Sequence, residues 1–312
     1  MAQPPYPPPP GYGQPPPQYG QRPQQAQQPS YGQPPYGQQP QYGQQPQYGQ
    51  PPRVRDHQIP AHAHERLTVM REHKFFTSDL SVNEFLLVKE AGFQPLGLVM
   101  GSSIYSIGAQ QLGQAAPGEV MALTQALYQS RELAMERMEA EAEELGADGI
   151  VAMRLTVSVH AWGTNIIEFL AIGTAVKSLA APGQYRTHDG RPFTSDLSGQ
   201  DFWTILNAGY RPLGFVMGNC VFYVGPPVQQ AMNGELAGPT QALYDSRELA
   251  MERMQFEAES LQAEGIVGVT VDESNHTWGP TVLEFSAVGT AVVAIRADHQ
   301  IPRPALVLTV NG

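Results

Sequence analysis

Two short turns carry the side chains of this sequence that are best suited to chemistry. Each reads His-x-Trp-Gly, with His160 and Trp162 in the first turn and His276 and Trp278 in the second. An imidazole beside an indole could bind a metal, move a proton or contact a neighbouring subunit, or it could stack on the ring for packing. One histidine per turn is a poor metal site, so zinc or copper at His160 and His276 would need ligands from neighbouring subunits.

Two other groups of residues are weaker candidates for a transition-metal site. His62 and His64 alternate along the chain, although the C-terminal segment that resembles this one lacks the pair, which favours a chance arrangement in a linker. Methionine thioethers suit Cu(I), but methionine is also a common filler of irregular cores. The methionines concerned are three apart on a predicted helix: Met135 with Met138, and Met251 with Met254.

Glu168 and Glu284 occupy equivalent positions inside apolar strands, each directly before a Phe. A carboxylate between hydrophobic neighbours must face solvent, a pore or a basic partner. Arg131 and Arg247 are the candidate partners, and structural ion pairs are favoured over ligand sites. We expect these four residues, like the two turn tryptophans, to be structural or to lie at interfaces.

The sequence contains no recognisable catalytic motif. It has no P-loop, no GxGxxG after a strand, no GxSxG elbow and no HExxH. No catalytic residue and no cofactor site is therefore predicted. A non-enzymatic protein is favoured, and an enzyme of unknown type with a pocket between subunits stays open.

Composition narrows the class of protein. The formal net charge is −11 and no basic run occurs, which argues against nucleic acid as a direct partner. The single cysteine, Cys220, permits no intrachain disulfide and fits a reducing compartment. Because no signal-peptide pattern and no apolar stretch of about 18–20 residues is present, we expect a cytoplasmic protein without a membrane span.

The elements that would position these residues come in two copies. The string Ser130–Met138 recurs as Ser246–Met254, and Phe76–Ser81 recurs as Phe193–Ser198 in the same order. The chain therefore contains one domain twice. The predicted organisation is a tail (1–52), a linker (53–73), domain 1 (74–180), a linker (181–189), domain 2 (190–296) and a C-terminal coda (297–312).

Each domain is predicted to be α+β, with helices packed on a mostly antiparallel sheet. A capping box at Ser81–Glu84 begins a short helix, and a strand bent by Pro and Gly follows. A long helix covers about 119–145, and 235–261 in the second copy, with i,i+4 ion pairs such as Arg253 to Glu257 on its outer face. Two strands close each domain.

The two ends of the chain carry further patterns. The tail is almost entirely Pro, Gln, Gly and Tyr, so it cannot bury enough apolar surface to fold, and it is either an inert spacer or a segment for self-association or partner docking. Asp56–Pro60 recurs as Asp298–Pro302, and Leu-Thr-Val follows each copy. These Leu-Thr-Val segments are hypothesised to be edge strands or docking arms.

Residues 130–151 and 168–176 make the domain recognisable. Both copies, over about 74–180 and 190–296, resemble the YbjQ-like family, which is labelled as a heavy-metal-binding domain. The second copy departs from the first at residues 262–265. The resemblance implies a small subunit that assembles in rings of five, and it implies no ligand set that maps onto residues here.

A ring of five cannot close from two-domain chains, because five is odd. The resemblance therefore predicts that five chains form two stacked rings, one of N-terminal and one of C-terminal domains. The leading functional hypothesis is a non-enzymatic oligomeric binding or scaffold protein. The alternative is a heavy-metal (zinc or copper) binding protein with ligands at subunit interfaces.

Overall fold

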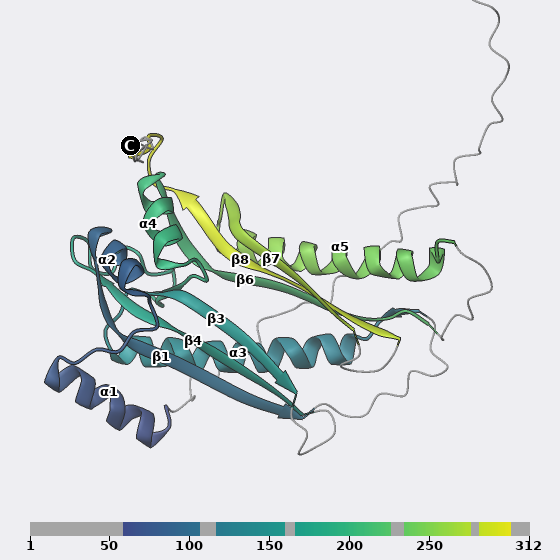
Figure 1. Ribbon diagram of the computed structural model, residues 1–312, viewed down its shortest axis with the longest axis horizontal. Helices are drawn as coiled ribbons and strands as arrows, with labels where there is room; N and C mark the ends of the chain where they lie inside the picture. Colours follow the sequence, from purple (N-terminus) through teal and green to yellow (C-terminus); the bar gives the residue numbers. More distant parts are fainter. Residues whose placement is uncertain (1–58, 107–116, 160–165, 226–233, 276–280, 301–312) are drawn as a thin grey trace, which may run out of the picture. The chain divides into compact units, whose positions relative to one another are not determined.

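The computed structural model describes residues 59–106, 117–159, 166–225, 234–275 and 281–300, all of which lie in one compact unit, Val54–Gly312. The tail, residues 301–312 of the coda, and the His-x-Trp-Gly turns lie outside the described residues. Two long helices each lie along a sheet of long strands (Figure 1).

Domain 1 contains three antiparallel strands in the order β1-β4-β3, with β1 at the edge. A short helix precedes β1 and a long helix follows it. The elements are α2 (Val82–Glu90), β1 (Phe93–Ser106), α3 (Met121–Glu144), β3 (Gly149–Val159) and β4 (Ile166–Ser178).

Domain 2 repeats this arrangement element by element, with strands in the order β6-β8-β7. The prediction of two tandem α+β domains is confirmed. The elements are α4 (Gly199–Asn207), β6 (Tyr210–Tyr223), α5 (Ala237–Ser260), β7 (Gly265–Asn275) and β8 (Val282–Ala294).

Two short strands cross from one domain into the sheet of the other. Strand β2 (Gly118–Glu119) leads into helix α3 of domain 1 but pairs with β6 of domain 2. Strand β5 (Phe193–Thr194) opens domain 2 but pairs in parallel with β3 of domain 1. Each four-stranded sheet therefore takes its fourth strand from the other domain, an exchange that no pattern in the sequence predicts.

The local signals for helix ends are confirmed. The Ser81 hydroxyl accepts a hydrogen bond from the Glu84 amide, and Glu84 Oε2 accepts one from the Ser81 amide at 2.8 Å, which completes the capping box. Gly92 and Gly209 follow the short helices at φ values of 83° and 92°, a left-handed conformation that suits glycine.

The bent strands lie close to the backbone of the long helices. The register of β1 against β4 shifts between Pro95 and Gly97, which marks the predicted bulge. A Cβ added at Gly101 would collide with the backbone oxygen of Ala134 on α3. The expected close approach of two backbones at this strand is therefore confirmed.

A further helix, α1 (Ala61–His73), lies within the segment predicted as a linker. Its Leu67 and Met70 are buried. Since Leu67–Val69 is helical, its interpretation as an edge strand is wrong, and the corresponding residues 308–310 lie outside the described residues.

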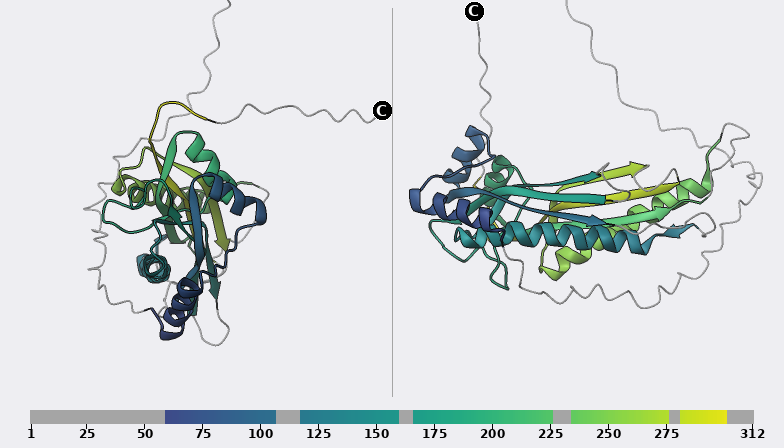
Figure 2. Two further views of the ribbon diagram at one scale, coloured as in Figure 1. Left: turned by 90° about the vertical axis from the view of Figure 1, so that its left-hand side faces the viewer. Right: turned by 90° about the horizontal axis from the view of Figure 1, so that it is seen from below.

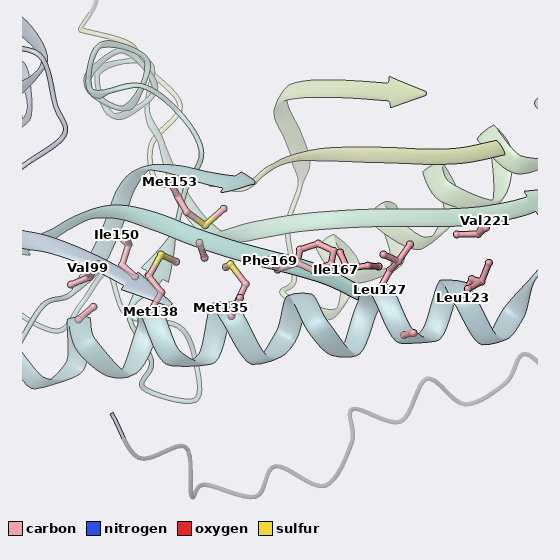
Figure 3. Packing of buried hydrophobic residues seen from close by; sticks show 14 of the residues in the cluster. Val99, Leu123, Leu127, Met135, Met138, Ile150, Met153, Ile167, Phe169 and Val221 are labelled. Atoms are coloured by element: carbon pink, nitrogen blue, oxygen red, sulfur yellow. The ribbon is translucent and has the colours of Figure 1, made fainter. Parts of the chain in front are cut away.

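The main core forms along helix α3 and includes residues of both domains (Figure 3). The predicted apolar face of α3 is buried, with Leu127, Ala134 and Met138 fully enclosed. Val221 and Tyr223 of β6 belong to the same cluster. Helix α3 thus packs on β1 and β4 of its own domain and on β6 of domain 2 (Figure 2).

The close approach at Gly101 gives a test of this packing. Gly101→Ala is expected to lower the free energy of unfolding by about 1–3 kcal/mol, because the added methyl group must displace backbone. Gly238→Ala is the control, since Gly238 is exposed in helix α5 and has open space for a Cβ. Urea unfolding measures both, and equal stability of the two variants would contradict the packing.

Candidate functional site

The structure does not reach the predicted metal ligands. His160 and His276, with Trp162 and Trp278, lie in the turns outside the described residues. Among the residues that the structure describes, no group of three or more His, Cys, Asp or Glu side chains could hold a metal ion. A zinc or copper site at His160 and His276 therefore stays a prediction.

Polar side chains instead gather where the two domains meet. Arg131 of α3 donates to both carboxylate oxygens of Glu257 on α5, with the shorter distance 2.7 Å, and it also bonds Glu132. The guanidinium lies over the ring of Tyr128, 5.0 Å from its centroid. Burial alone would lower the pKa of Arg131, but the carboxylates of Glu257 and Glu132 raise it above its ordinary value, so the side chain stays charged.

Helix α3 also satisfies the backbone of the edge strand β6. The Tyr128 hydroxyl accepts from the Asn219 amide at 2.9 Å and donates to the Met217 carbonyl. Thr124 Oγ1 accepts from the Val221 amide at 3.0 Å. An unpaired strand edge is normally a site where another chain adds, and here side chains of a helix cover it.

The same edge is extended by strand β2. Gly118 and Glu119 lie opposite Tyr223 and Phe222 in antiparallel register. The Glu119 carboxylate binds Arg253 at 2.7 Å, and Arg253 also donates to the Asn219 carbonyl. The two domains are therefore joined by backbone pairing, by ion pairs and by side chains that bond a strand edge.

Aromatic side chains fill the other end of this domain junction. Phe193 and Phe202 of domain 2 pack on Phe93 of domain 1, with ring centroids 6.3 and 5.1 Å away. All three are at most 1% exposed. Gly149 leaves room for the Phe193 ring, because any Cβ there would overlap it. Burial of each ring contributes roughly 1.5–3 kcal/mol.

One largely buried carboxylate at the junction has an altered pKa. Glu139 of α3 lies 3.1 Å from Arg191, the residue that leads into strand β5 by way of Pro192. Its side chain is 13% exposed. Burial raises the pKa of Glu139 from 4.5 to about 7, and the attraction of Arg191 opposes this shift.

The helix residues that join the two domains have equivalents on helix α5 of domain 2, and there they are exposed. The repeat makes Tyr244 equivalent to Tyr128 and Arg247 equivalent to Arg131. Tyr244 is 50% exposed, and Arg247 lies over its ring and bonds the adjacent Glu248. The side chains that join the two domains thus recur on the open face of α5.

The strand that α3 covers, β6, likewise has an equivalent in domain 1, strand β1, whose outer edge is exposed. Met100 and Ile104 of the edge strand β1 are 37% and 56% exposed, whereas their equivalents Met217 and Val221 are at most 4% exposed under α3. No further strand pairs with the outer edge of β1 among the described residues.

The aromatic pair that packs at the domain junction also has an equivalent in domain 1. Phe76 stacks on Phe85 with ring centroids 5.2 Å apart, as Phe193 stacks on Phe202. Phe76 is 46% exposed, whereas Phe193 is fully buried. In domain 2, open space lies over Gly265, the equivalent of Gly149.

Several expected pairings take another form in the structure. The contacts shown for Arg131 go to Glu257 and Glu132, so a pair with Glu168 stays a prediction, as does that of Arg247 with Glu284. The expectation that Glu257 lies on an outer face is wrong, because Arg131 of domain 1 covers its side chain, which is 28% exposed, and burial raises its pKa.

Comparison with known proteins places both domains in one family. The family model described as "Putative heavy-metal-binding" matches residues 88–178 and again residues 214–295.

None of the helices that the structure describes is long and apolar enough to cross a membrane.

Relatives of two sizes match the chain. An encapsulin nanocompartment protein of Mycobacterium tuberculosis is 49% identical over 258 residues, which cover 80% of this chain and 97% of the relative. A UPF0145 protein of Halorubrum lacusprofundi is 38% identical over 104 residues, which cover 32% of this chain and 97% of the relative. A UPF0145 protein of Thermotoga maritima is 40% identical over 26% of this chain and 80% of the relative.

The ion pair at the junction can be tested by removing one partner. Arg131→Ala leaves a partly buried Glu257 without its cation, so the free energy of unfolding should fall by about 3 kcal/mol. Arg247→Ala, at the exposed equivalent position, should change it by less than about 0.5 kcal/mol in dilute protein. Equal effects in chemical denaturation would contradict the described junction.

The pKa of Glu139 predicts a pH dependence of stability. Because its folded pKa is raised, the folded protein holds a proton between pH 4.5 and about 7 that the unfolded chain releases. The resulting stabilisation is present in acid and is lost as the pH rises through 7. Glu139→Gln should therefore gain up to about 3 kcal/mol relative to wild type between pH 4.5 and 8. A difference that does not change with pH would refute the assignment.

Proposed function

The chain belongs to the family described as "Putative heavy-metal-binding", whose domain it contains twice, and we propose that it is a non-enzymatic protein that assembles with copies of itself into a scaffold. The observation that carries this proposal is the domain junction. One complete junction is formed inside the chain, and the two half-junctions left over are complementary to each other.

The leftover halves are unlike faces, so their contact is heterologous. The open face of α5 would meet β1 of the next copy, whose own α5 stays open for a third. A heterologous contact closes into a ring or extends as a filament, depending on the rotation between neighbours. Since a chain with unsatisfied ends continues to add copies, assembly is the expected state at sufficient concentration.

A ring built through this junction would alternate domain 1 and domain 2. It differs from the two stacked rings expected from the family resemblance, in which each ring contains one kind of domain. Both arrangements accommodate five chains. The nanocompartment named for the Mycobacterium tuberculosis relative supports a closed assembly.

The scaffold is further proposed to be cytoplasmic and to bind a partner protein through its tail. A heavy-metal site with ligands at subunit interfaces stays the alternative, and elemental analysis of untagged wild type and of a His160→Ala/His276→Ala variant distinguishes the two. Stoichiometric zinc or copper that is lost in the variant would favour the alternative.

The mass of the particle tests self-assembly. Native mass spectrometry of the full chain should show a multiple of its 34.0 kDa mass. Tyr244→Ala should reduce assembly at least tenfold, because it removes a hydroxyl that would bond the strand edge and a ring that docking would bury. Glu259→Ala is the matched control on the same helix, since its equivalent Glu143 stays exposed where the junction is formed. A wild-type protein that remains a single chain would refute the proposal.

A further inference from the structure

Helix α1 covers part of the strand face that the proposed assembly needs. Arg66 of α1 bonds Glu141 on α3 at 2.6 Å and donates to the Leu98 carbonyl on β1 at 2.9 Å. Met70 lies against Gly97 at the start of the same strand. Met100 and Ile104, further along β1, remain exposed.

The carboxylate that Arg66 binds is the repeat equivalent of Glu257. The Glu141 carboxylate accepts a hydrogen bond from the Met100 amide at 2.9 Å, and the Glu257 carboxylate accepts one from the Met217 amide at the same distance. Each carboxylate also binds an arginine that comes from outside its own sheet and helix pair. That arginine is Arg131 of the neighbouring domain for Glu257, and Arg66 of α1 for Glu141.

A second arginine on α3, Arg137, is the equivalent of a residue that forms an ion pair across the domain junction. Arg253 donates to the Asn219 carbonyl on β6 and binds Glu119 of domain 1. Its equivalent, Arg137, donates to the Ser102 carbonyl on β1. The repeat equivalent of Glu119 is Glu235, which is exposed just before helix α5.

We infer that the outer edge of β1, with Arg137 and Glu141, is the docking surface for helix α5 of a second copy, and that docking replaces Arg66 by Arg247 on Glu141. The inference rests on the proposed self-assembly and specifies its contacts. Glu235 of one copy binds Arg137 of the next, as Glu119 binds Arg253 inside the chain.

Beside Arg66, helix α1 is held by two exposed polar contacts, those of His64 and Arg71 with Glu144. It has no side-chain hydrogen bond at its N-cap, Pro60, and only Leu67 and Met70 of its residues are buried. An isolated helix of this length is marginal in water. The junction that replaces it would bury a helix face, a strand edge and the Phe76–Phe85 pair, so α5 is the stronger occupant.

Charge reversal tests the pairing of Glu235 with Arg137. Sedimentation of the full chain over a dilution series should show that Arg137→Glu and Glu235→Arg each weaken assembly at least tenfold. The double variant should restore it to within threefold of wild type, because the reversed pair is again complementary. Glu259→Arg is the control and should have no effect. Single variants that assemble normally, or a double variant as weak as the single ones, would overturn the docking surface.

The role of α1 is tested by removing its arginine. Arg66→Ala should strengthen assembly about tenfold, because Glu141 can then bind Arg247 without first losing another arginine. Arg247→Ala should weaken assembly by a similar factor, because docking then removes Arg66 from Glu141 and no arginine replaces it. His62→Ala, fully exposed on the same helix, is the control. Hydrogen exchange at residues 61–73 should be faster in assembled wild type than in single chains.

The outcomes separate this inference from the proposed function. If wild type assembles but Arg66→Ala assembles equally or less well, and α1 is protected in the particle, then α1 is a permanent part of the interface and the replacement is wrong. If neither protein assembles at any concentration, both the inference and the proposed function fail.

Discussion

The exposed edge of a long β-strand is the constraint on which this structure depends. A strand edge presents unpaired amides and carbonyls, which must be bonded or must attract another chain. On β6 the constraint is met by the neighbouring domain: Tyr128 and Thr124 bond the backbone, and strand β2 continues the sheet. The pairing of strand β2, the shared core along α3 and the Arg131–Glu257 pair all accompany the way in which domain 1 covers that edge.

The same constraint is met only in part on β1. Glu141, Arg66 and Arg137 bond the Met100 amide and the Leu98 and Ser102 carbonyls, but Met100 and Ile104 stay exposed, and no further strand of the described residues pairs with this edge. Domain 1 has a covered helix face and an open strand edge, whereas domain 2 has the reverse. A chain built in this way has two unlike ends, which we propose to fit each other. In domain 1 the tyrosine and the arginine bond an edge strand and a carboxylate across the junction, and the proposed assembly would give Tyr244 and Arg247 the same partners in the next copy.

The helices and long strands could be predicted from the sequence, but the two short strands that pair in the sheet of the other domain could not. The long helices, the capping box at Ser81 and the bulge near Pro95 were predictable, because periodicity, caps and Pro or Gly act locally. Strands β2 and β5 were not, because dipeptides such as Gly118–Glu119 show no periodicity. Glu257 was misplaced on an outer face, since one helix cannot reveal that a second domain covers it. The repeat itself held the missing signal, for Tyr128 and Arg131 recur with their partners.

Electron cryomicroscopy of the assembled full chain tests the junction most directly. The account predicts that α5 of each copy lies along β1 of the next, in the geometry that α3 adopts on β6 within the chain. It also predicts Arg247 on Glu141, with α1 displaced from that carboxylate. A particle in which domain 1 contacts only domain 1, and domain 2 only domain 2, would contradict it.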